Sequence, residues 1–339
     1  MFSEFVRILS CVFLVVIFLV GLVGNALVCS AVHSNNGMRT PTNLILVNLA
    51  MADLLGCLVN MPIMFITFKT DFVHEYIEVL GEIHFVLTVF IGIAVCLCHI
   101  LLCIDRYDAV KAPFHRRITK LRMKRISQII WCISLGAGVI VSVLVIVVPT
   151  HWLTLHEDDP HFIAGEILNG VGTLVILLIL FAMMYSSYKV KMGVAAHNVS
   201  MMNAFGRRTL DREIKITKAA TVLTICFTVT CLPWVIVRLV YSITGHQDKI
   251  SYIISYTFLY TSHAINPIVY AGFIKSFKRA MHQSLSSFLT KALCGLPTCV
   301  HQNLPHEESF ELSSRLGIPS NKVEPTNVNA NTIQARTGC

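Results

Sequence analysis

The sequence predicts an all-α fold, a bundle of seven membrane-spanning helices followed by a short amphipathic helix on the membrane surface. Two observations lead to this fold class. The chain has 339 residues, of which 55% are hydrophobic and 14% are charged, whereas soluble domains carry about 25% charged residues. Apolar runs long enough to cross a bilayer, roughly 20 residues each, recur seven times along the chain.

The seven apolar segments lie at residues 8–32, 43–68, 83–109, 126–148, 163–190, 216–243 and 250–272, and the last is the most polar. Lysine and arginine gather after the third and seventh segments and between the fifth and sixth. Because such residues accumulate on the cytosolic side, we expect a plasma-membrane protein with an extracellular N-terminus, residues 1–7, and a cytosolic C-terminus. The net charge of +8 follows mostly from this bias, so it gives no reason to invoke nucleic acid.

The region after the seventh segment changes from apolar to amphipathic and then to polar. Its apolar residues recur at helical spacing, at Phe273, Phe277, Met281, Leu285 and Phe288, a pattern typical of a helix lying on a membrane. The membrane domain should therefore span residues 8–285, and the polar remainder, 286–339, should be a disordered cytosolic tail. Cys294 and Cys299 are candidates for palmitoylation.

Charged and polar residues inside the apolar segments are few, and such residues commonly have functional roles. Asp105-Arg106-Tyr107 closes the third segment, and Asp53 is the only acid deep within one. Pro233 and Pro267 each remove a backbone hydrogen bond and permit a kink. No nucleophile with a base and no metal-ligand spacing stands out, so we expect neither an enzyme nor a cofactor.

An ordered set of motifs resembles the rhodopsin-like (class A) G-protein-coupled receptors over residues 20–285. The set comprises Gly24-Asn25, Leu49-Ala50-Met51-Ala52-Asp53, Asp105-Arg106-Tyr107, Trp131, Phe227, Leu232-Pro233 and Asn266-Pro267-Ile268-Val269-Tyr270. The resemblance implies a receptor that promotes nucleotide exchange on a heterotrimeric G protein without covalent chemistry. It also implies arrestin, receptor kinases and membrane lipid as partners, and a receptor dimer is possible.

The same resemblance assigns an activation switch at the cytosolic side. Glu213 would hold Arg106 in the resting form, and its release would let the sixth helix move outward and open a groove for the G protein. Tyr185 and Tyr270 would then swing toward Arg106. The full set for switching and coupling is Asp105, Arg106, Tyr107, Glu213, Tyr185, Tyr270, Asn266, Pro267, Pro113 and Phe114.

The polar core departs from the family pattern. The resemblance implies a water and sodium pocket at Asp53, with Asn25 and Asn266 nearby. His263 falls beside that site and could either pair with Asp53 in place of sodium or be an ordinary core histidine bonded to a carbonyl. His99 falls in an apolar layer between this pocket and the cytosol, either weakening the resting state or bonded to a carbonyl as an ordinary core histidine. Cys231 also replaces the family's usual tryptophan. These departures predict notable activity without a ligand.

The expected ligand pocket has one fixed cation, Arg238, which favours an acidic or lipid-like small molecule, although a snorkelling surface arginine is the alternative. The pocket set is Thr88, Val89, Gly92, Glu166, Asn169, Trp234, Arg238 and Tyr260. A non-signalling dimerisation partner or decoy receptor and a small membrane transporter are competing functions. Intact Arg106, Glu213 and Tyr270 argue against a decoy, and the lack of internal repeats argues against a transporter.

Overall fold

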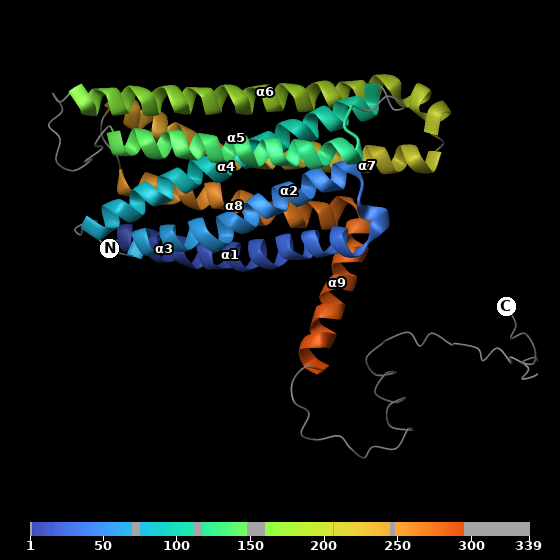
Figure 1. The fold of residues 1–339 in the computed structure, drawn as a ribbon, viewed down its shortest axis with the longest axis horizontal. Coiled ribbons are helices and arrows are strands. Elements are labelled where there is room, and N and C mark those ends of the chain that lie inside the picture. The colour runs from blue at the N-terminus through green and yellow to red at the C-terminus, as the bar shows by residue number, and fades with distance from the viewer. Residues whose placement is uncertain are drawn as a thin grey trace, which may run out of the picture. The chain divides into compact units, whose positions relative to one another are not determined.

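The protein is described by a computed structural model that covers residues 2–69, 75–111, 117–147, 160–205, 207–244 and 248–294. Helices account for nearly all of these ranges, and no strand occurs in them (Figure 1). The helices are α1 (Phe2–Ser34), α2 (Pro41–Leu55), α3 (Met61–Lys69), α4 (Glu75–Lys111), α5 (Lys120–Val147), α6 (Pro160–Phe205), α7 (Arg207–Thr244), α8 (Lys249–Phe273) and α9 (Lys275–Cys294). A π-helical turn, Gly56–Asn60, joins α2 to α3. The all-α prediction is confirmed.

The helices match the predicted membrane segments. Within the described residues, six helical stretches are long and apolar enough to cross a membrane: Glu4–Ser34, Pro41–Ile66, Val79–Ala109, Lys120–Leu144, Gly170–Gly193 and Asp211–Thr244. The seventh predicted segment is α8, which has 25 residues. Its polar side chains Ser255, Ser262, His263 and Asn266 are buried, so they reduce its hydropathy without facing lipid.

Local sequence explains where two of these helices begin. Thr40 precedes Pro41, and its hydroxyl accepts a hydrogen bond from the backbone N–H of Asn43 at 3.3 Å. Proline suits the first helical position because the N–H it lacks has no partner there. Asp248 caps α8 in the same way, accepting from the N–H of Ser251 at 2.8 Å. Both caps satisfy backbone donors that a helix start leaves without partners.

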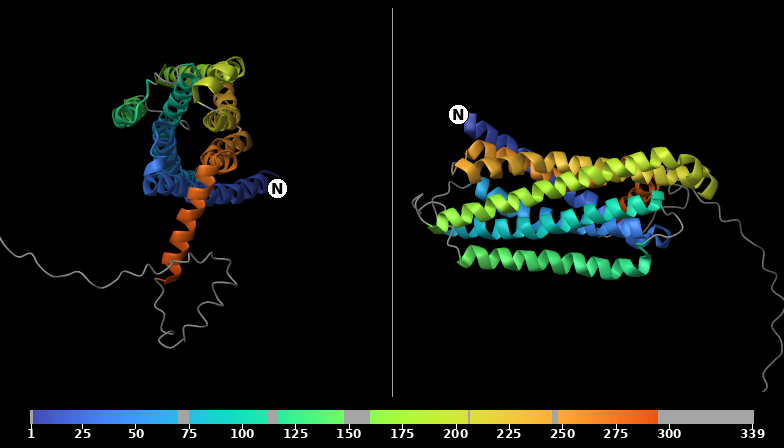
Figure 2. Two further views of the ribbon diagram at one scale, coloured as in Figure 1. Left: turned by 90° about the vertical axis from the view of Figure 1, so that its right-hand side faces the viewer. Right: turned by 90° about the horizontal axis from the view of Figure 1, so that it is seen from above.

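The spanning helices pack as a closed ring. The order around the ring is α1, α2, α4, α6, α7 and α8, and each helix contacts the next (Figure 2). The ring is closed by the contact of α8 with α1, and α5 packs on α4. Close approach of α1 and α8 depends on Gly24, because a Cβ atom there would lie 2.7 Å from the Cβ of Pro267. This packing directs the polar residues of α2, α4, α7 and α8 into the interior.

Candidate functional site

A buried charge network surrounds Arg106 near the end of α4. The guanidinium donates hydrogen bonds to the neighbouring Asp105 carboxylate, through Nε at 3.1 Å and also through Nη2. Nη2 donates to the hydroxyl of Thr42 on α2 at 2.6 Å, and this hydroxyl donates to Asp105 at 2.7 Å. Arg106 and Asp105 are each only 1% exposed. Each charge therefore needs these partners, since an unpaired buried ion is strongly disfavoured.

Glu213 connects this network to α7. Its Oε2 accepts a hydrogen bond from Nη1 of Arg106 at 3.0 Å, across 107 residues of chain. The Glu213 side chain is 16% exposed, so water screens the pair only in part. We call Thr42, Asp105, Arg106 and Glu213 the Arg106 network. The contact between Glu213 and Arg106 therefore joins α7 to α4.

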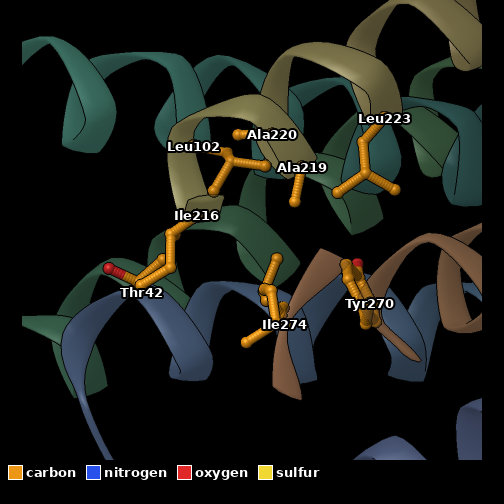
Figure 3. A pocket seen from close by; sticks show the side chains of 9 residues that line it. Thr42, Leu102, Ile216, Ala219, Ala220, Leu223, Tyr270 and Ile274 are labelled. Atoms are coloured by element: carbon orange, nitrogen blue, oxygen red, sulfur yellow. The ribbon is translucent and has the colours of Figure 1, made fainter. Parts of the chain in front are cut away.

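Neither tyrosine expected to approach Arg106 forms a hydrogen bond with it in the structure. Tyr185, on α6, is 55% exposed. Tyr270, on α8, is fully buried, and its hydroxyl has no hydrogen-bond partner among the described residues. It lines a cavity of about 10 Å³ whose other walls include Thr42 and Leu102 (Figure 3). That volume is close to the space needed for one water molecule.

A second polar network surrounds Asp53 in the middle of the bundle. Oδ1 of its carboxylate lies 2.8 Å from Nδ1 of His263, and Oδ2 accepts from the Asn266 amide at 2.6 Å. Asn25 does not bond to Asp53 directly. Its amide donates to the backbone carbonyl of His263 at 2.8 Å. We call these four residues the Asp53 network; both carboxylate oxygens are already occupied by protein groups.

Room for the His263 ring comes from Gly56, in the π-helical turn. A Cβ atom at this position would lie 2.7 Å from Nε2 and 2.9 Å from Cε1 of His263. The ring therefore lies against the bare backbone of this turn, within hydrogen-bond distance of Asp53. A π-helical turn often marks a functional position, and here it brings the glycine under the imidazole.

His99 lies on α4 and is completely buried. Its ring stacks on Phe227 of α7, with ring centres 4.6 Å apart and planes inclined by 19°. Both ring nitrogens lack hydrogen-bond partners among the described residues. The carbonyl-bonded alternative therefore does not describe this histidine, and desolvation of the ring is uncompensated within the described part of the chain.

The predicted pocket residues come together only in part. Thr88 accepts a hydrogen bond from the Asn60 amide at 3.0 Å, and the Tyr260 hydroxyl lies 2.6 Å from Nε2 of His84. Trp234 is buried on α7, whereas Gly92 and Val89 are half-buried and a Cβ added at Gly92 would meet open space. The side chains of Glu166 and Asn169 lie outside the described residues.

Arg238, the expected cation of the pocket, is buried rather than snorkelling, with 5% exposure. Its guanidinium lies 5.7 Å from the ring centre of Phe85 and 5.6 Å from that of Tyr241, within the range of cation–π attraction. The surface alternative is therefore wrong for this arginine.

Four other predicted positions cannot be placed. Pro113 and Phe114, the expected docking residues for the G protein, lie outside the described residues. The Cys294 side chain and all of Cys299, the lipidation candidates, lie outside them too.

Sequence reasoning missed three partners that the fold supplies. Thr42 lies just before the second predicted segment and His84 lies at the start of the third, and only helix packing shows that they contact Arg106 and Tyr260. The third is Asp108, which accepts hydrogen bonds from Arg117 at 2.6 to 3.0 Å. These bonds raise the pKa of the Arg117 guanidinium. The acid directly after Asp105-Arg106-Tyr107 was the available signal for this pair.

Comparison with known proteins gives a consistent set of relatives. Residues 24–270 match the family described as 7 transmembrane receptor (rhodopsin family). The chain is similar to the human neuromedin-U receptor 2, with 26% identity covering 80% of this chain and 70% of the relative. It is also similar to the chicken (Gallus gallus) adenosine receptor A2b, with 25% identity covering 86% and 92% of the two chains.

The family match confirms several expectations at once. A rhodopsin-family receptor is a non-enzymatic signalling protein of the cell surface that couples to heterotrimeric G proteins and crosses the membrane several times. The matched span contains Asp53, the Arg106 network and the motif ending at Tyr270. The chain belongs to the rhodopsin family of seven-transmembrane receptors.

Proposed function

We propose that this receptor activates its G protein appreciably without any ligand, with its N-terminus outside the cell and the Arg106 network at the cytosolic side. The observation that carries the proposal is the bare imidazole of His99, stacked on Phe227 between α4 and α7. A buried polar group without a partner costs about 1–3 kcal/mol. Any movement of α7 that admits water to His99 removes part of this cost, so the resting state is disfavoured.

The activation step follows from the contacts that close α7 against α4. When Glu213 releases Arg106, the cytosolic end of α7 can move away, and the resemblance places the G protein in the groove that opens. Tyr270, whose hydroxyl has no partner among the described residues beside a water-sized cavity, is then available to Arg106 together with Tyr185. The intact Arg106–Glu213 contact supports signalling over a decoy role.

The test is a panel of G-protein activation sensors applied to the receptor without added ligand. The wild type should signal above background. His99→Leu replaces the imidazole by a side chain that needs no hydrogen bond, which stabilises the resting state by ~1 kcal/mol or more. Its signal should therefore be lower than that of the wild type by fivefold or more. Ser134→Ala is the control, because its buried hydroxyl bonds only to its own helix at Ile130. Equal, background-level signals from wild type and His99→Leu would refute the proposal.

For the ligand, we propose an acidic or lipid-like molecule whose anionic group meets Arg238. Burial of this guanidinium between two aromatic rings supports a site with low dielectric constant, where a carboxylate or phosphate is bound strongly. Oleic acid and lysophosphatidic acid are suitable probes. If the wild type responds to a probe and Arg238→Gln does not, the assignment is supported. If Arg238→Gln responds to the probe as fully as the wild type does, the assignment is contradicted.

Arrestin and receptor kinases are proposed regulators of the cytosolic tail, and a receptor dimer is a further proposal. Each follows from family membership alone. Residues 295–339 of the tail lie outside the described ranges.

A further inference from the structure

A cavity of about 270 Å³ lies between α4, α6 and the segment that leads into α5. It is lined by Ile104, Tyr107, Arg117, Tyr185, Ser186 and Lys189, and we call it the Lys189 cavity. The proposed orientation of the receptor places this cavity at the inner leaflet of the membrane, and its role as a lipid site depends on that orientation. The cavity is separate from the ligand region around Arg238, which lies near the other end of α7.

The charges in the Lys189 cavity favour an anion. Arg117 is held by the buried carboxylate of Asp108, yet 67% of the Arg117 side chain is exposed. Lys189 lies with its ammonium 5.4 Å from the ring centre of Tyr185, and no carboxylate of the described residues pairs with it. One arginine and one lysine against one aspartate leave a net positive charge at this position.

The surface next to the cavity is apolar. Three side chains preceding Lys189 on α6, Leu178, Phe181 and Tyr185, are 68%, 71% and 55% exposed. Their spacing of three and four residues places them on one helix face, which leads from the bilayer interior to Lys189. A soluble anion would gain nothing from this stripe, whereas an acyl chain would bury apolar surface on it.

We propose that the Lys189 cavity binds the phosphate headgroup of an anionic phospholipid of the inner leaflet. The phosphate contacts Lys189 and the exposed edge of Arg117, and one acyl chain lies along Tyr185, Phe181 and Leu178. The Ser186 and Tyr107 side chains supply hydroxyl groups to the headgroup region. Anionic lipids are concentrated in the cytosolic leaflet, where each basic residue contributes about 1 kcal/mol to their binding.

The test measures lipids bound to the purified full-length receptor by native mass spectrometry. Dioleoyl phosphatidylserine, dioleoyl phosphatidylcholine and glycerol 3-phosphate are added separately to the wild type, Lys189→Gln, Lys189→Glu and Lys191→Gln. Lys191 is a matched control, since it is exposed on the same helix and does not line the cavity. Size-exclusion profiles and melting temperatures verify that all variants fold.

We expect phosphatidylserine to bind the wild type and Lys191→Gln equally and more tightly than phosphatidylcholine. Lys189→Gln should bind it about fivefold more weakly, the factor for ~1 kcal/mol, and Lys189→Glu more weakly still. Equal binding by Lys189→Gln and the wild type would overturn the proposal, and so would equally tight binding of glycerol 3-phosphate. The measurement needs no G protein, so a receptor that is silent in the activation sensors but selects phosphatidylserine through Lys189 would refute only the proposed ligand-independent activity.

Discussion

Replacing Gly56 by alanine tests the packing that places His263 against Asp53. The new Cβ atom would lie 2.7 Å from Nε2, 2.9 Å from Cε1 and 3.1 Å from Cδ2 of the His263 ring. Carbon atoms prefer separations of about 3.5–4.0 Å, so the ring must move or the helices α2 and α8 must separate. The ring cannot move freely, because Nδ1 lies 2.8 Å from the Asp53 carboxylate.

Both responses lead to a similar loss of stability. Keeping the ring in place overpacks the core, which costs about 1–3 kcal/mol. Moving the ring breaks its contact with Asp53, and a hydrogen bond to a charged group contributes about 1.5–3 kcal/mol. Alanine recovers up to ~1 kcal/mol through its higher helix propensity. We therefore expect Gly56→Ala to lower the free energy of unfolding by about 1–2 kcal/mol.

The assay is the fraction of detergent-solubilised receptor that remains monomeric after heating. Gly136→Ala is the control, because a Cβ atom there meets no heavy atom within 4 Å, and it should melt at the wild-type temperature or above. In a His263→Ser background the added methyl group meets no ring, so the penalty of Gly56→Ala should disappear. An unchanged penalty in that background, or a Gly56→Ala receptor as stable as the wild type, would refute the reasoning.

Three other substitutions each test the contacts of one residue. Glu213→Gln removes the charge that faces Arg106 at 3.0 Å and should raise basal G-protein activation about fivefold, for ~1 kcal/mol; an unchanged signal in the activation sensors would contradict this. Thr42→Val removes a buried hydroxyl from the Arg106 network and should reduce the free energy of unfolding by about 1–3 kcal/mol, whereas Thr42→Ser should melt like the wild type. Asp248→Ala removes the cap on the N–H of Ser251 and should cost ~1 kcal/mol in the same melting assay, with Asp248→Asn close to wild type if capping is the cause.

The helices could be predicted from the sequence because a membrane imposes their length and apolar character. Residues 43–68 were predicted as one span, and the structure builds this span from α2, a π-helical turn and α3. The turn is not visible in the hydropathy of the segment, because hydropathy reports apolar character and not the pattern of backbone hydrogen bonds. Similarly, α6 continues beyond its apolar segment to Phe205, and α7 begins before its apolar segment, at Arg207. Hydropathy gives no signal for these two extensions.

The candidate site could be predicted where ionisable residues fall inside an apolar segment. Asp53, Arg106 and His263 are conspicuous for that reason, and the structure gives each of them a polar partner. Thr42 could not be found in this way, because a threonine at the start of a helix is common and its bond to Arg106 joins residues 64 positions apart. The contact partner of the His99 ring could not be predicted either. Whether the ring meets a carbonyl or an aromatic side chain depends on the packing of α4 against α7.

In the proposed mechanism, two contacts between α4 and α7 act on the same conformational equilibrium in opposite directions. The Arg106–Glu213 pair stabilises the closed state, but Glu213 is partly exposed, which reduces its contribution toward that of a surface ion pair, about 1 kcal/mol. The bare His99 nitrogens disfavour that state by about 1–3 kcal/mol. Asp105 and Thr42 bind Arg106 from α4 and α2, so these hydrogen bonds do not cross to α7. Since the two opposing contributions are similar in size, we expect a small free-energy gap between resting and active states, and a gap of that size is what ligand-independent activity requires.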